Sequence, residues 1–120
     1  MVKVIKLKDK FDRFTDLWSP KIVGRVDNYD VKIVKVKGEL VQHDHKDEDE
    51  LFFVLKGRFD LELDGGTVSI GRGEMAVVPR GVSHKPSAKK ETWLMVFESS
   101  KIKHTGDVTT EKTLTRFEEI

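Results

Sequence analysis

Apolar residues at every second position recur along the chain from residue 21 onward, and this alternation predicts β-strands. Residues 58–64 show the pattern most cleanly, with Phe59, Leu61 and Leu63 on one face of the expected strand and acidic residues on the other. Further strands are expected at 31–37, 51–55, 68–70, 76–78 and 92–98. Many short strands with close glycine or charged turns predict an all-β sandwich or barrel.

Helical spacing is confined to the start of the chain. Residues 8–17 carry Phe11, Phe14 and Leu17 at intervals of three, which places them on one face of a helix. Pro20 prevents such a helix from continuing. We therefore expect a short N-terminal helix that covers one end of the β-structure.

Length and composition narrow the possible functions. The 120 residues suit one domain, residues 1–120, and the 22 basic and 21 acidic residues leave a net charge of only +1. Because no basic stripe is present, we expect no nucleic-acid partner. No signal peptide is readable and no apolar run has the length of a membrane span, so we expect a cytoplasmic protein with no membrane partner.

Candidate metal ligands stand out because the chain has no cysteine, so that any metal must be held by histidine and carboxylate. His43 and His45 are two positions apart, which puts them on the same face of a strand. Glu50 follows an acidic turn, where Glu48 is a rival ligand, and His84 lies a hairpin away. These donors suit one divalent transition-metal ion (Zn, Mn, Fe, Ni, Co or Cu), with positions left open for a ligand. A His-x-His pair alone, however, is usually surface histidine.

The joint spacing resembles the two conserved motifs of the cupin superfamily. The first motif, at about 38–57, is matched by His43, His45, Glu50 and Gly57, and the second, at about 73–88, by Gly73, Pro79, Gly81 and His84. The resemblance implies a cupin double-stranded β-helix, or jelly-roll barrel. It also implies that His43, His45, Glu50 and His84 are the metal ligands, since six residues separate Glu50 from Gly57. The Asn that often closes the second motif is replaced by Ala88.

Residues around this metal site could form a ligand pocket. If Glu50 faces inward, Phe52 and Val54 do so too, and they would give the pocket an apolar wall. Trp93, Met95 and Phe97 share one face of another expected strand and could also line the pocket. Ordinary core packing is the alternative role for all five residues.

A segment near the C-terminus carries a finer resemblance. His104 precedes Thr105-Gly106-Asp107, which is similar to a Thr-Gly-Asp segment in short cupins labelled mannose-6-phosphate isomerase-like. In those cupins an Asn usually stands where this chain has His104. A simple turn built around Gly106 is the alternative interpretation.

The resemblance implies a metal-binding protein but does not choose its reaction. We expect a small metalloenzyme of isomerase or oxygenase type, acting on a carbohydrate-like or keto/hydroxy-acid substrate. For a sugar phosphate, Arg80, Lys85 and Lys89 are the candidate basic residues. The alternatives are a non-catalytic small-molecule sensor, in which the metal is structural or holds the ligand, and a regulatory subunit. Small cupins commonly form dimers, and exposed sheet edges need covering, so we expect a homodimer.

Overall fold

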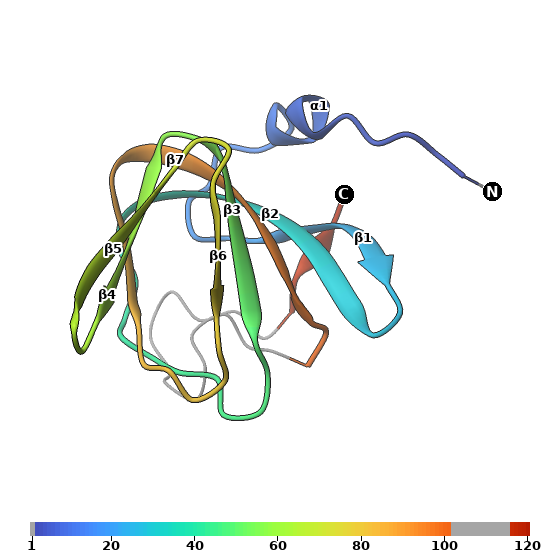
Figure 1. Ribbon diagram of the computed structural model, residues 1–120. Coiled ribbons are helices and arrows are strands. Elements are labelled where there is room, and N and C mark those ends of the chain that lie inside the picture. The colour runs from blue at the N-terminus through green and yellow to red at the C-terminus, as the bar shows by residue number, and fades with distance from the viewer. Residues whose placement is uncertain (1, 102–115) are drawn as a thin grey trace.

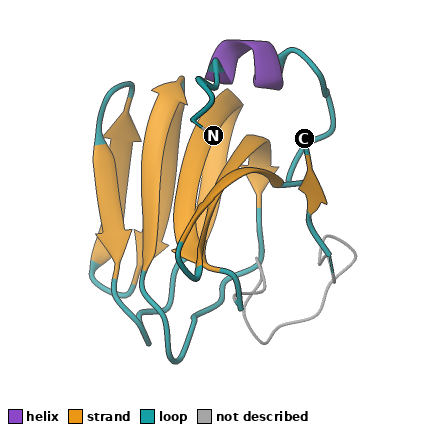
Figure 2. Ribbon diagram, turned by 90° about the vertical axis from the view of Figure 1, so that its right-hand side faces the viewer, coloured by secondary structure: helices purple, strands orange, loops and turns teal. Residues whose placement is uncertain are grey.

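Figure 1 shows the computed structural model, which describes residues 2–101 and 116–120. The described elements are α1 (Leu7–Phe11), β1 (Lys21–Val26), β2 (Tyr29–Glu39), β3 (Glu50–Lys56), β4 (Arg58–Leu63), β5 (Gly66–Gly71), β6 (Met75–Val78), β7 (Lys85–Ser99) and β8 (Glu118–Glu119). The strands curve around an apolar interior, and α1 lies at one end of them (Figure 2). The predicted all-β jelly-roll fold with a short N-terminal helix is confirmed.

The long strand β7 joins the parts of the barrel together. Along one edge it pairs with β2 over almost its whole length, and along the other it pairs first with β4 and then with β3. β5 continues the sheet beyond β4, and β6 continues it beyond β3. Register shifts between Val36 and Gly38, and between Val54 and Lys56, mark irregularities of the kind that bend a strand.

The barrel core is built from the alternating positions of these strands. Buried apolar side chains come in alternation from β2 (Val34, Val36), β3 (Phe52, Val54) and β7 (Leu94, Val96). Trp18 reaches the same core from the segment before β1 and donates a hydrogen bond from its indole nitrogen to Lys37 O at 2.9 Å. Ala88, where the family often has Asn, is buried in β7 and pairs with Gly38.

The N-terminal helix is shorter than the sequence predicts. It ends at Phe11 instead of reaching Leu17. Phe11 is buried and stacks on Trp93 with ring centroids 4.6 Å apart, Phe14 is half-buried beyond the helix, and Leu17 is exposed. The chain must leave the helix early because Trp18 turns into the barrel core, with a positive φ of 57°. Tertiary burial of one side chain thus overrides the local helical spacing.

The C-terminal strand β8 lies beside β1 and pairs with it in parallel.

In the described part of the chain, no helix is both long enough and apolar enough to span a membrane. His104 and the segment 105–107 lie outside the described residues, so the mannose-6-phosphate isomerase-like resemblance stays a hypothesis.

Candidate metal centre

Two loops bring the four predicted ligands together. His43 and His45 lie before β3, Glu50 is the first residue of β3, and His84 directly precedes β7. The loops are joined by a pair of backbone hydrogen bonds between His43 and His84, at 3.0 and 2.9 Å, and by a bond of 2.7 Å from Gly81 N to His45 O. His43 forms only an isolated bridge with His84, so the predicted strand around the His-x-His pair is wrong, although the side chains still converge.

The donor atoms have a separation that one ion can span. One donor atom from each of the four buried residues lies within 4.8 Å of the others. Glu50 Oε1 is 3.3 Å from His45 Nε2 and 3.6 Å from His84 Nε2. Two donors bound to one ion at about 2.1 Å each are at most about 4.2 Å apart, so the four atoms lie close to the spacing that a single ion would require.

Hydrogen bonds to the backbone orient two of the imidazole rings. His43 Nδ1 is 2.7 Å from Val41 O, and His84 Nδ1 is 3.0 Å from Val82 O. A proton on Nδ1 leaves Nε2 as the donor to a metal, which is the usual arrangement of a metal-binding histidine.

Three of the converging atoms are buried without a hydrogen-bond partner among the described residues: His45 Nε2, Glu50 Oε1 and His84 Nε2. Such an atom costs about 1–3 kcal/mol when left unsatisfied. A metal ion bound between them would remove this cost, and the nitrogen and oxygen donor set suits a divalent transition metal. The cluster therefore fits a metal that the four residues could hold.

The electrostatics favour the ligand form of two of these side chains. Burial lowers the pKa of His43 to about 4, so this imidazole is neutral at physiological pH. Burial alone would raise the pKa of Glu50, but its close polar neighbours Glu98, His45 and His84 outweigh burial and hold that pKa well below its usual range. Burial alone would lower the pKa of His84, but the contact with Glu50 and the hydrogen bond to Val82 O outweigh burial and raise that pKa above its usual value.

The acidic turn before β3 has a structural role. Glu48, the rival ligand, is half-buried and lies outside the cluster. Asp49 is exposed and accepts a hydrogen bond from Arg80 N at 2.9 Å, which lowers the pKa of Asp49 and connects the two ligand loops.

A cavity of about 40 Å³ adjoins the cluster, which is room for about three water molecules. Its three polar lining residues are His43, Glu50 and Glu98. The remaining lining is apolar: Trp18, Pro20, Val34, Val36, Leu40, Phe52, Phe59, Pro86, Leu94 and Val96.

The five residues predicted to line a ligand pocket do not all lie on the same side of the barrel wall. Phe52 lines the cavity, and Val54 is buried in the surrounding core without lining it. Trp93, Met95 and Phe97 do not line this cavity, contrary to the prediction, because they lie on the outer face of β7. There Trp93 stacks on Phe11, and Phe97 stacks on Tyr29. The β3–β7 register explains the difference. Glu50 is paired with Glu98, so the even-numbered residues of β7 face the interior with Glu50.

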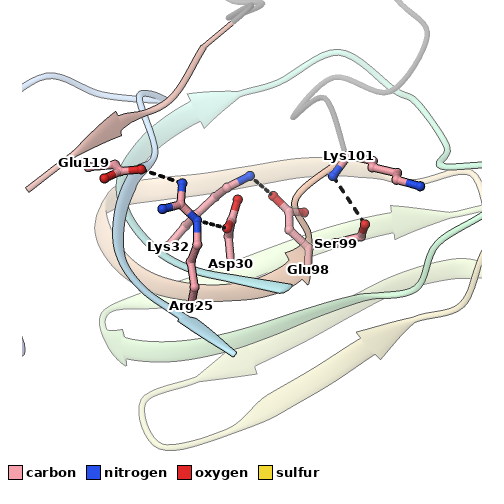
Figure 3. Close-up of polar contacts among 7 residues, drawn as sticks. All are labelled: Arg25, Asp30, Lys32, Glu98, Ser99, Lys101 and Glu119. Atoms are coloured by element: carbon pink, nitrogen blue, oxygen red, sulfur yellow. Dashed lines mark hydrogen bonds and ion pairs between the residues drawn. The ribbon is translucent and has the colours of Figure 1, made fainter. Parts of the chain in front are cut away.

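Sequence reasoning missed two buried polar residues beside the cluster, Lys32 and Glu98. Lys32 Nζ donates to Glu98 Oε1 at 2.8 Å, and the two side chains point toward each other from β2 and β7 (Figure 3). Burial and the charge of Glu50 raise the pKa of Glu98 well above its usual range. The sequence did indicate that Lys32 faces the interior, because it stands at alternate positions with Val34 and Val36. It did not indicate this for Glu98, because residues 93–97 are apolar on both faces of the strand.

Comparisons with known proteins agree with this site. A family model described as a cupin domain matches residues 31–100, which include all four ligand positions. The chain is 42% identical to a cupin-2 domain containing protein from Shewanella frigidimarina, with a TM-score of 0.79 over 80% of this chain and 94% of that one. It is 33% identical to NMB1881 from Neisseria meningitidis, with a TM-score of 0.75 over 82% of this chain and 100% of that one.

A curated relative from Aquifex aeolicus, an uncharacterized protein, is 31% identical over 70 residues. The match covers 57% of this chain and only 58% of that relative.

Proposed function

The chain belongs to the cupin domain family, and from this premise we propose that it is a small metalloenzyme. His43, His45, Glu50 and His84 would hold one divalent transition-metal ion. The observation that carries the proposal is the convergence of buried donor atoms, three of which have no other partner among the described residues.

A bound ion would supply Lewis-acid chemistry, polarising an oxygen atom of a substrate. The chain's own residues have separate tasks. The backbone hydrogen bonds of His43 and His84 keep the imidazole rings aimed at the centre. Phe52, Leu94 and Val96 line the adjoining cavity and would offer apolar contact to the part of the substrate away from the metal.

The cavity also narrows the expected substrate. Its lining is largely apolar and its volume small, which favours a small keto or hydroxy acid over a carbohydrate. Two of the candidate basic residues for a sugar phosphate are already paired, Arg80 with Asp49 and Lys85 with Glu39. Lys89 is exposed, and none of the three lines the cavity. An isomerase or oxygenase reaction on an oxygen-bearing small molecule suits this site.

A second candidate function is non-catalytic binding of a small molecule by the same site. The cavity lining favours it, because among the described residues Glu98 is the only titratable side chain in the lining apart from the predicted ligands His43 and Glu50. An enzyme and a sensor would share the metal but differ in turnover.

Metal analysis of the purified protein tests the shared part of the proposal. We expect about one equivalent of a transition metal in the wild type, and a large loss in Glu50→Gln and in His45→Ala. Glu48→Gln is the matched control, since Glu48 lies two residues away and outside the cluster. An absence of bound metal after reconstitution with each candidate ion would overturn the proposal.

Turnover then separates the two functions. The reconstituted protein is screened with small keto and hydroxy acids for oxygen consumption and for isomerisation. Product formation that Glu50→Gln abolishes supports the enzyme. A thermal shift on adding a compound, without any turnover, supports the binding protein.

A further inference from the structure

Lys32 and Glu98 form a buried polar pair in the barrel interior. The Lys32 side chain is 0% exposed and that of Glu98 is 1% exposed, and Nζ lies 2.8 Å from Oε1. Lys32 Nζ also lies 3.6 Å from the centroid of the Phe117 ring. Charged side chains are rarely buried so completely unless they are paired, so the position of this pair calls for a reason.

The pair lies directly beside a predicted metal ligand. Glu98 is the cross-strand partner of Glu50 in the β3–β7 ladder, and one oxygen of each carboxyl group is buried without a hydrogen-bond partner among the described residues. Both line the same cavity. Residues directly opposite each other on neighbouring strands have Cβ atoms only about 5 Å apart, so the side chain of Glu98 limits the positions that the Glu50 carboxyl group can adopt.

Stability alone is a weak explanation for the pair. Removing two charged groups from water costs more than their attraction often returns, and well-packed apolar residues can replace such pairs without loss of stability. A second carboxyl group beside Glu50 adds to this cost unless a cation balances it. Lys32 is the cation placed to do so.

We propose that Glu98, held by Lys32, is a positioning residue that keeps Glu50 turned toward the three histidines and thereby raises the metal affinity of the centre. The proposal rests on the proposed metal-binding function. Groups that hydrogen bond to a metal ligand typically change metal affinity by about 10- to 100-fold when they are removed.

Two double variants separate positioning from packing. Lys32→Met with Glu98→Leu removes the pair and leaves no polar group at position 98 that could contact Glu50. Lys32→Met with Glu98→Gln also removes the charges but keeps a side-chain amide that can donate to Glu50. The two variants therefore differ only in the ability of residue 98 to hold the ligand.

Zn²⁺ affinity is measured by competition with a chromophoric chelator, and the absorption spectrum of the Co²⁺-loaded protein reports the geometry of the centre. We expect the leucine variant to lose about 10- to 100-fold in Zn²⁺ affinity and to change the Co²⁺ spectrum. The glutamine variant should stay within about threefold of the wild type. Lys21→Met is the matched control, a buried lysine on β1 that is paired with Asp16 and Glu118 and does not line the cavity.

Equal affinities for the leucine variant and the wild type, with the melting temperature retained, would overturn the proposal, as would equal losses in both double variants. If the leucine variant does not fold, Glu98→Asp replaces it, because it keeps the charge but withdraws the carboxyl group from Glu50. A wild-type affinity in Glu98→Asp overturns the proposal too. A wild type that binds no metal contradicts the proposed function itself, which is a distinguishable result.

Discussion

Two of the three buried histidines of the metal centre, His43 and His84, have pKa values that are shifted in opposite directions. His43 loses its proton easily because burial disfavours the imidazolium ion, and its pKa falls to about 4. His84 keeps its proton more firmly, because the neighbouring Glu50 carboxyl group outweighs burial and raises the pKa of His84 above its usual value. In the metal-free protein, a proton therefore competes with the metal more strongly at His84 than at His43.

This difference predicts how metal affinity depends on pH. Only the deprotonated imidazole binds a metal, so Zn²⁺ affinity should fall by up to about tenfold per pH unit once the pH drops below the pKa of His84. The proton of His43 competes with the metal only near pH 4, the pKa of that imidazole. Chelator competition between pH 8 and pH 5 measures the slope. A constant affinity over that range would contradict the assignment of His84 as a ligand.

Gly57 meets two constraints at a single position. Its φ is +89°, and a Cβ atom there would lie 2.5 Å from Thr92 Oγ1. Gly57→Ala should therefore lower the free energy of unfolding by about 2–5 kcal/mol, from backbone strain and from displacement of Thr92. Gly81→Ala is the control, because φ is +79° but no atom lies within 4 Å, so the cost should be only about 1–2 kcal/mol. Denaturant unfolding measures both, and equal losses would disprove the role of Thr92.

At the scale of the elements, the side chains of β7 alternate between an inner face, toward the cavity, and an outer face. Leu94, Val96 and Glu98 face the cavity, whereas Trp93 and Phe97 pack against rings from the N-terminal segment and β2. The same strand thus forms the cavity wall on one face and anchors α1 on the other.

Substitutions on the two faces of β7 should lower the free energy of unfolding by different amounts. Leu94 is 1% exposed, so Leu94→Ala should lower the free energy of unfolding by about 2–5 kcal/mol and enlarge the cavity without removing a metal ligand. Met95→Ala, at a half-buried position on the outer face, should cost about 1 kcal/mol. Denaturant unfolding and metal content test the pair of variants. A larger cost for Met95→Ala would show that the assigned register is wrong.

For the whole molecule, an apolar groove of about 600 Å³ is lined by residues of β4, β5 and β6, among them the core residues Leu61, Ile70 and Val78. Val68, Met75 and Val77 contribute to it with exposures of 43%, 55% and 51%. β5 and β6 each pair with one strand only among the described residues, so both present a free edge. Exposed apolar edges of this kind favour association with another chain.

We therefore expect a homodimer that buries this groove. Light scattering should give twice the 13.8 kDa mass of one chain, and Val77→Glu should shift the protein toward the monomer. Val26→Glu, at a residue of β1 with a similar exposure of 53%, is the control and should leave the dimer intact. A wild type that scatters as 13.8 kDa at all concentrations would disprove the dimer.

The sequence by itself determined the strands with clear alternation and the set of candidate ligands. The strand predicted at 58–64 appears as β4, because its apolar and acidic residues allow only one buried face. The ligands could be identified because their spacing with Gly57, Pro79 and Gly81 belongs to a known pair of motifs, and the structure brings all four together.

Tertiary structure alone decided which face of β7 looks inward and where the helix ends. Residues 93–97 are apolar on both faces, so only the pairing of Glu50 with Glu98 sets the phase of the strand. The helix stops at Phe11 because Trp18 is buried in a core formed by residues far along the chain. Lys32 and Glu98, 66 positions apart, meet for the same reason. Such contacts depend on long-range pairing, which local spacing does not encode.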